Sequence, residues 1–387
     1  MATWNLDPGV THLNHGSFGA TPVEVLAEQQ RWRDLMESNP VSFMLETYQP
    51  ALEDSREAIA GFVGADSGGV VLVPNATYGV NAVLRSMEDR LAPGAEIIIT
   101  NHGYNACSNA VEVSARKVGA EVVTVDIPVP VRDEESIVSA ILNRVSEKTA
   151  LVVLDHVTSP TGLIFPVKDV VESLEPAIPV LVDGAHAPGM IPLALSSLGA
   201  SFYTANCHKW MCAPKGTGFL YVAPQHREAT YAAVVSHGYN DAWPGEQSHF
   251  QSQFDWTGTH DPTSWFSIGA AVSVMNSHHP DGWDGIRSSN HQLTLLGRDM
   301  LTRAVGTEVL APESMIGSIA SISISPLDGT SSDIFDPLMI ELRHKWAIEV
   351  PVFTWPDRNH RLIRISAQQY NNSHDYERLA EALVAEL

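Results

Sequence analysis

The chain has 387 residues, of which 18% are charged and 44% hydrophobic, a composition typical of a soluble globular protein rather than a disordered one. This length can bury a sizeable core, in one large α/β unit or in a large domain with a smaller one. The formal net charge of −22 disfavours nucleic-acid and anionic-membrane partners, because like charges repel. A small anionic ligand remains possible, since a few well-placed donors can hold it.

The cysteines and the N-terminus indicate the compartment. Cys107, Cys207 and Cys212 form no CxxC pair and no evenly spaced framework, so we expect free thiols in a reducing environment. The N-terminus has no basic region followed by an apolar run, and no window approaches the about 20 apolar residues of a membrane span. These features favour a cytoplasmic protein.

Short apolar runs between residues 69 and 222 alternate with amphipathic stretches and predict strands. They are GVVLVP, EIIIT, EVVTVDI, ALVVLD, PVLVD, SFYTAN and GFLYV. This order predicts βαβ units, and the lack of polar alternation is typical of a parallel sheet covered by helices on both faces. The fold class is therefore α/β, with ligands expected at the carboxyl ends of the strands.

The remaining chain divides into an irregular region and a second α/β pattern. Residues 223–285 are rich in Gly, Pro, Trp and His without a clear period, which predicts an irregular connection. The segments that follow are a helix at Ile286–Val305, the strand SIASISIS, a helix near Asp333 to Trp346, the strand RLIRISAQQ and the terminal helix HDYERLAEALVAEL. They predict a smaller α+β domain.

Two of the strand ends carry polar residues suited to an anion or a small ligand. In VLVPNATYG a helix begins near Ala76, so free N–H groups of Ala76 and Thr77 and the Thr77 hydroxyl can bind phosphate, although Asn75 can equally be a simple N-cap. In LVVLDHVTSPTG the polar residues are Asp155, His156, Thr158 and Ser159. Ordinary turn chemistry around the Pro and Gly of that motif is the alternative.

Two further strand ends indicate a particular cofactor. Asp183 ends an apolar strand in PVLVDGAHAPG, and a carboxylate there requires a cationic partner, because burying it unpaired is costly. In pyridoxal 5′-phosphate (PLP) enzymes that partner is the pyridinium nitrogen. Lys209 follows the next strand in SFYTANCHKW, before a Gly-rich turn. A lysine is usually a surface residue, but this setting points to cofactor attachment.

Together DGAHA, NCHKW and APKGTGFL resemble the class V branch of fold-type I PLP enzymes, and most of all the isopenicillin N epimerase-like group. The resemblance extends over almost the whole chain, through LNHGSFGATP, NAT, HVTSPTG, GTHD and RISAQQYN. It implies an N-terminal segment contributing to the active site (1–20), a large PLP-binding domain (21–275) and a small C-terminal domain (276–387).

The resemblance also implies a role for individual residues. Lys209 would form the Schiff base with PLP, Asp183 would face the pyridine nitrogen, and Ser159 and His186 would lie near the phenolic oxygen. The phosphate would be held by Thr77, Asn206 and His208. Thr259 of GTHD would reach the cofactor of the partner subunit in a homodimer with shared active sites. Tyr104 would stack on the ring, with His102 as the alternative.

Arg364 matches the arginine that binds the substrate α-carboxylate in this family. A guanidinium suits that planar group because it can donate two parallel hydrogen bonds, although a surface charge on an edge strand is the alternative. His15 of the LNHGS loop is the next candidate for the carboxylate.

The family chemistry usually breaks the Cα–H bond of an amino acid, with Lys209 as the base. The candidate reactions are epimerisation and β-elimination by a C–S lyase, with a class V aminotransferase as the alternative. A cysteine desulfurase is disfavoured because no cysteine follows Cys212. A metal-dependent hydrolase using Asp155, His156, Asp183, His186 and His208 is a remote alternative that leaves Lys209 and Arg364 without roles. A non-catalytic binding protein is weakened by the pairing of Lys209 with Asp183.

Overall fold

A computed structural model describes residues 3–240, 247–326 and 335–387. Its centre is a 7-stranded sheet in the order β2-β8-β7-β6-β5-β3-β4. The strands are β2 (Val70–Val73), β3 (Glu96–Thr100), β4 (Glu121–Val125), β5 (Thr149–Asp155), β6 (Val180–Asp183), β7 (Phe202–Asn206) and β8 (Gly218–Val222). Only β8 pairs antiparallel with its neighbours. The predicted strands and the mainly parallel sheet are confirmed.

Helices cover both faces of this sheet. Along β3, Ile98 packs into one buried cluster, while Ile97 and Ile99 pack into another on the opposite face. The longer helices of this part are α2 (Val23–Ser38), α4 (Tyr48–Val63), α5 (Ala76–Met87), α6 (Asn105–Val118), α7 (Glu134–Leu142) and α8 (Val167–Leu174), and the short ones are α1 (His15–Phe18), α3 (Pro40–Ser42) and α9 (Leu195–Leu198). Helices α5 and α6 contribute to one cluster, and α7 and α8 to the other.

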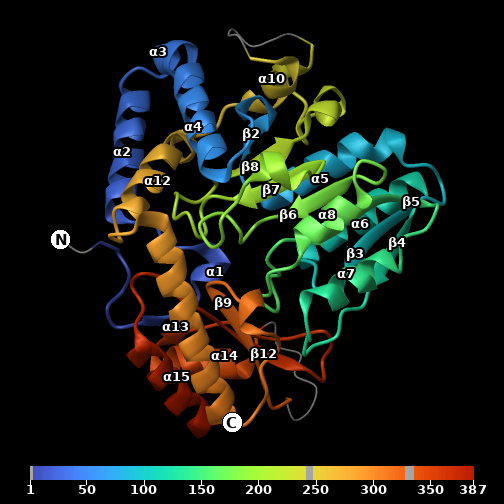
Figure 1. Ribbon diagram of the computed structural model, residues 1–387. Helices are drawn as coiled ribbons and strands as arrows, with labels where there is room; N and C mark the ends of the chain where they lie inside the picture. The colour runs from blue at the N-terminus through green and yellow to red at the C-terminus, as the bar shows by residue number, and fades with distance from the viewer. Residues whose placement is uncertain (1–2, 241–246, 327–334) are drawn as a thin grey trace.

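The C-terminal part is built on a 3-stranded antiparallel sheet in the order β11-β12-β9. Its elements are α13 (Gly282–Val305), β9 (Ile319–Ile324), α14 (Pro337–Trp346), β10 (Ile348–Glu349), β11 (Val352–Thr354), β12 (Arg361–Ser366) and α15 (Ser373–Glu386). The helix predicted near Asp333 to Trp346 begins at Pro337 in the structure. The Asp336 side chain caps it by accepting from Leu338 N at 2.9 Å. Asp333 itself lies outside the described residues. Figure 1 shows this part below the central sheet.

The irregular region predicted at residues 223–285 is confirmed for residues 223–240, which contain only the short 3-10 turns Pro224–Ala229 and His237–Tyr239, and is wrong for residues 249–276. It contains the helices α10 (His249–Asp255), α11 (Thr263–Phe266) and α12 (Ile268–Asn276). In α10 the residues from Phe250 to Asp255 are all buried, so the helix shows no amphipathic period in the sequence. Its start is fixed by a capping box between Ser248 and Gln251.

The first residues of the chain pack against the C-terminal part. Strand β1 (Thr11–His12) pairs in parallel with β10, and Leu13 O accepts from Ser366 N at 3.0 Å. Helix α1 follows and lies between the central sheet and the C-terminal strands (Figure 1). The segment thus runs to the carboxyl edge of the sheet, while the domain boundaries at residues 20 and 275 stay a prediction. No described helix is long and apolar enough to cross a membrane.

Candidate active site

Two cavities of about 380 Å³ each adjoin at the carboxyl edge of the sheet. We call them the inner and the outer cavity. The inner cavity brings together the predicted cofactor residues Ala76, Thr77, Tyr104, Ser159, Asp183, His186, Asn206, His208 and Lys209. The outer cavity is lined by Arg364 and by residues of the C-terminal part. Lys209, Ser159, Tyr104, Ser17 and Phe18 line both, so Lys209 lies at the junction.

The buried amine of Lys209 is less basic than that of an ordinary lysine. Its Nζ lies 3.0 Å from His186 Nε2. Burial lowers the pKa of the amine to about 8, and the positive charge of Arg364 adds to the effect, while the Asp183 carboxylate opposes it. About a tenth of the amine is therefore uncharged at pH 7, far more than in an ordinary lysine, and this form can act as a nucleophile or general base.

Trp210 determines which ring nitrogen of His186 carries the hydrogen. The indole N–H of Trp210 donates to His186 Nδ1 at 3.3 Å, and an indole nitrogen can only donate. The single hydrogen of the neutral imidazole is therefore on Nε2, which points at Lys209 Nζ. His186 stays neutral because burial and the charge of Lys209 hold its pKa well below the usual value. His186 Nε2 can therefore donate to Lys209 Nζ only when that amine is uncharged, because an ammonium group has no lone pair to accept.

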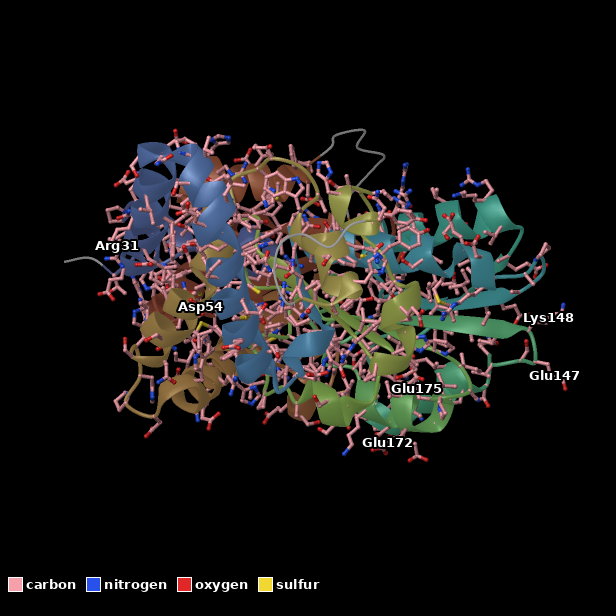
Figure 2. All side chains as sticks on the ribbon, turned by 90° about the horizontal axis from the view of Figure 1, so that it is seen from above. Arg31, Asp54, Glu147, Lys148, Glu172 and Glu175 are labelled. Atoms are coloured by element: carbon pink, nitrogen blue, oxygen red, sulfur yellow. The ribbon has the colours of Figure 1, made fainter. Side chains whose placement is uncertain are left out.

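Two carboxylates line the inner cavity. Asp183 and Asp155 end neighbouring strands in register, and both line the cavity. Unlike Glu147 and Lys148, which reach outward at the edge of the molecule (Figure 2), both carboxylates are buried. Burial raises the pKa of both groups, and the pKa of Asp155 is raised further by Asp183. Among the described residues neither has a cation within ion-pair distance, which fits a cationic ligand group such as a pyridinium.

The Asp183 carboxylate is oriented by two donors. Its Oδ2 accepts from the thiol of Cys107 at 3.0 Å, and its Oδ1 accepts from Ala185 N at 2.9 Å. The three cysteines Cys107, Cys207 and Cys212 are buried free thiols, as expected. Sequence reasoning gave Cys107 no part in the site.

The N-terminus of α5 also lines the inner cavity, and here one expectation needs correction. Ala76 N donates to Asn206 Oδ1 at 2.9 Å, so the Ala76 amide is not free for phosphate. Asn75 caps the helix by accepting from Tyr78 N at 2.9 Å. In the described part of the chain the Thr77 amide has no partner, and with the Thr77 hydroxyl it remains suited to an anion.

His208 completes this end of the cavity. Its Nδ1 donates to Thr217 O at 2.8 Å, which leaves Nε2 as the unprotonated nitrogen of the neutral ring. Burial lowers the pKa of His208 to about 4. A bound phosphate would favour the protonated ring, because an opposite charge stabilises the cation.

Tyr104 and His102 occupy different surroundings. Tyr104 lines both cavities and is 45% exposed. His102 is fully buried and lines neither cavity; its ring nitrogens lie 2.7 Å from Thr161 Oγ1 and 2.9 Å from Ile127 O. Its ring packs edge-on against Trp355 at 4.5 Å. The geometry therefore favours Tyr104 over His102 as the ring that faces the cofactor.

Arg364 is a buried cation rather than a surface charge. It is 6% exposed, and no described carboxylate lies within ion-pair distance. Its Nη1 donates to Ser159 O at 2.6 Å and its Nη2 to Ser17 Oγ at 3.1 Å, while its Nε has no partner among the described residues. Burial lowers its pKa only to about 10, so the charge persists at neutral pH. Such a group calls for an anionic ligand.

His15 does not lie where a substrate ligand is needed. It is fully buried and lines neither cavity. Its Nδ1 lies 3.0 Å from Tyr370 Oη and its Nε2 3.0 Å from Lys209 O. The expected role of His15 as a carboxylate ligand is therefore corrected: the ring supports the backbone of the Lys209 loop.

Two other expectations concern residues outside these cavities. Thr259 is exposed and lines neither cavity of its own chain, so its proposed contact with a partner subunit stays a prediction. His156, named for the metal-dependent alternative, lies with its Nδ1 2.8 Å from Tyr203 Oη. Within residues 3–240, 247–326 and 335–387, no group of three or more His, Cys, Asp and Glu side chains is arranged to hold a metal.

A buried lysine amine, a buried strand-end carboxylate and a helix N-terminus line one cavity at the edge of this sheet, and a buried arginine lines the adjoining one. These groups are those of a PLP-dependent enzyme of fold type I. The family model described as aminotransferase class-V matches residues 19–379. The chain belongs to that family.

Known relatives agree with this assignment. The isopenicillin N epimerase of Amycolatopsis lactamdurans is 31% identical over 395 residues, which cover 98% of this chain and 96% of the relative. The L-cysteine desulfhydrase of Arabidopsis thaliana is 29% identical over 404 residues, covering 97% and 87%. The solved structure of a cystine C-S lyase with its product cysteine persulfide superposes with a TM-score of 0.80 at 19% identity, covering 97% of this chain and 98% of that chain.

Proposed function

We propose that the protein is a PLP-dependent C–S lyase that removes a thiol from the β-carbon of an α-amino acid. The observation that carries the proposal is the position of Lys209 Nζ at the junction of the two cavities. An amino acid whose carboxylate is held by Arg364 in the outer cavity brings its Cα toward that amine. The outer cavity, with a volume of about 380 Å³, offers space for a leaving group.

The residues around the inner cavity divide the tasks of holding the cofactor. Lys209 would attach it, Asp183 would stabilise the protonated ring nitrogen, and Tyr104 would pack on the ring. Ser159 and His186 would hydrogen-bond to the phenolic oxygen. Thr77, His208 and the amide nitrogen of Asn206 would hold the phosphate, while the Asn206 oxygen accepts from Ala76 N at the start of α5.

The reaction converts a cysteine S-conjugate and water into a thiol, pyruvate and ammonium. PLP, when bound, withdraws electrons from Cα and so weakens the bonds to that atom. Lys209 as the free amine takes the Cα proton, and the electron pair of the broken Cα–H bond expels the sulfur from Cβ. The leaving thiolate takes up a proton, Cβ takes up another to become the methyl group of pyruvate, and water replaces nitrogen at the former Cα.

Epimerisation is the second candidate, favoured by Tyr104. Inversion at Cα requires one group to remove a proton and another to return one to the opposite face. Tyr104 carries a hydroxyl and lines both cavities together with Lys209. Recovery of the D-amino acid from an L-substrate separates this reaction from elimination. A 2-oxo acid that retains the sulfur substituent would instead identify an aminotransferase.

Replacing Arg364 by alanine tests the orientation of the substrate. We expect the apparent dissociation constant of amino acids to rise about ten- to hundredfold, since a charge-assisted pair is worth about 1.5–3 kcal/mol. PLP binding and the reaction with simple amines should not change when they are measured above the pKa of Lys209, where the amine is uncharged in both forms. Spectral titration of the holoenzyme measures both, with Arg343→Ala, an exposed arginine paired with Glu349, as control. Unchanged amino-acid affinity would place the carboxylate elsewhere.

The pH dependence of cofactor attachment tests the state of Lys209. The rate at which cofactor-free protein binds PLP should rise through a midpoint near pH 8, because attack requires the uncharged amine. Arg364→Gln removes a positive charge that lowers the pKa of Lys209, so the midpoint should move upward. Absorbance changes on mixing, recorded from about pH 6 to about pH 10, give both midpoints. A downward shift would contradict the electrostatic argument.

The active enzyme is proposed to be a homodimer in which Thr259 reaches the partner subunit's cofactor phosphate. The exposure of Thr259 and of Phe18, which is 75% exposed at the mouth of both cavities, supports a covering partner. Thr259→Ala should weaken PLP binding about tenfold, as expected for one lost hydrogen bond. Sedimentation that finds a fully active monomer at assay concentration would reject the shared site.

A further inference from the structure

The outer cavity has an aromatic wall on the side of the C-terminal part. Phe353 and Trp355 form this wall. Pro351, Pro160 and Phe18 line the cavity beside them. These groups are large and mainly apolar. Cysteine, the substrate named for the desulfhydrase relative, is small and would leave much of a volume of about 380 Å³ to water.

The aromatic wall is held in place by contacts behind it. Phe353 lies on β11, where its backbone pairs with Leu362 of β12. The indole N–H of Trp355 donates to Asn101 O at 3.0 Å, and its ring packs against the buried ring of His102. A ligand group that packs on such a wall loses its own freedom but does not have to order the protein.

The charges of the outer cavity exclude a second ionic group on the ligand. Of the described residues that line it, Lys209 and Arg364 are the cations, and no Asp or Glu is among them. Arg364 is committed to the α-carboxylate and Lys209 to the cofactor and Cα. An ionic side-chain group packed against Pro351, Phe353 and Trp355 would therefore lose part of its hydration without gaining a partner of opposite charge, which is costly.

From these observations we infer that the substrate is an amino acid with a single carboxylate whose β-substituent is bulky, neutral and apolar or aromatic, and that this group packs on the aromatic wall of Phe353 and Trp355. The inference rests on the proposed function in that Arg364 and Lys209 orient the amino acid. It adds the chemical class of the side chain, which neither residue determines.

Three ligands whose side chains differ in size and charge test the inference on the holoenzyme. Calorimetry should give S-benzyl-L-cysteine a dissociation constant about ten- to hundredfold below those of L-cysteine and of S-carboxymethyl-L-cysteine, because burying several apolar carbons is worth about that factor. Equal or tighter binding of L-cysteine would overturn the inference, since the cavity would then be filled in the assembled enzyme. Tighter binding of S-carboxymethyl-L-cysteine would overturn it as well.

Substitutions in the wall provide the second test. Trp355→Ala should reduce the preference for S-benzyl-L-cysteine about tenfold and leave the affinity for L-cysteine unchanged. Phe335→Ala is the matched control, because Phe335 is an aromatic residue of the C-terminal part that is 57% exposed and lines neither cavity. An unchanged preference in Trp355→Ala would overturn the inference.

A gain of affinity separates a specific effect from damage to the fold. Phe353→Arg should raise the affinity for S-carboxymethyl-L-cysteine above that for S-benzyl-L-cysteine, because it adds a cation to the wall. No gain in a folded variant that still binds PLP would contradict the assignment of the wall. Tight binding of S-benzyl-L-cysteine without release of thiol would support this inference and reject the proposed elimination, so the two failures are distinguishable.

Discussion

Lys209→Ala should abolish the covalent attachment of PLP and lower turnover by about 10³-fold or more, because the variant loses both the attachment point and the general base. After borohydride reduction, mass spectrometry of the wild-type protein should find the cofactor mass on the peptide that contains Lys209. Lys215→Ala is the matched control, since Lys215 lies close in sequence but lines neither cavity. A cofactor adduct on Lys215 would show that the assignment of Lys209 is wrong.

The position of Lys209 explains why this effect should be so large. Its amine lies where the inner cavity, lined by Asp155 and Asp183, meets the outer cavity, lined by Arg364. The charge of Arg364 helps to lower the pKa of Lys209. No other described lysine lines either cavity. A solvent amine can restore only part of the lost function, because it is neither oriented by His186 nor held at that point.

Asp183→Asn should leave PLP bound but reduce turnover by about 10²- to 10³-fold, the cost of removing one pre-oriented charge from a catalytic site. The substitution preserves size and removes the negative charge that stabilises a protonated ring nitrogen. Steady-state kinetics together with a PLP titration measure the two effects separately. Turnover close to that of the wild-type enzyme would contradict the role of Asp183.

Cys107→Ala provides a graded control for this prediction. It removes the thiol that donates to Asp183 Oδ2 but leaves the donor Ala185 N and the charge itself in place. The loss should therefore be about tenfold or less, as expected for one hydrogen bond. A loss equal to that of Asp183→Asn would mean that the orientation of the carboxylate, rather than its charge, limits the reaction.

The central sheet could be predicted because its strands are buried on both faces and appear as unbroken apolar runs. The same burial hides helix α10, since a helix surrounded by protein shows no polar face. Element ends depend on local capping, as at Asn75 before α5, and such signals can be recognised in the sequence. The pairing of β1 with β10 joins segments far apart in the chain and leaves no local signal.

The inner cavity could be predicted largely because parallel strands place their carboxyl ends together. Asp183, Ser159 and Lys209 follow strands and meet at one edge for that reason. His15 was misjudged because residue type and spacing do not tell which way a ring points, and here the ring turns toward the Lys209 carbonyl instead of a cavity. Cys107 lies near the start of α6, after β3, and its nearness to the same edge was a signal that could have been used.

The outer cavity shows the limit of sequence reasoning. The contact between Trp355 and the Asn101 carbonyl joins the residue after β11 to the loop after β3, and neither segment carries a motif for it. The guanidinium of Arg364 is a second example. Its Nη atoms donate to Ser159 and Ser17, and its Nε has no partner among the described residues. Such arrangements follow from packing between distant segments and not from residue spacing.

The most direct measurement is the fate of S-benzyl-L-cysteine when it is incubated with the holoenzyme. If Lys209 removes the Cα proton of an amino acid held by Arg364, mass spectrometry and NMR should find benzyl thiol and pyruvate in equal amounts. The corresponding substrate with deuterium at Cα should react several-fold more slowly, and Lys209→Ala should give neither product. Release of carbon dioxide with formation of the amine would contradict the claim, because it would show that the bond to the carboxylate is broken instead of the Cα–H bond.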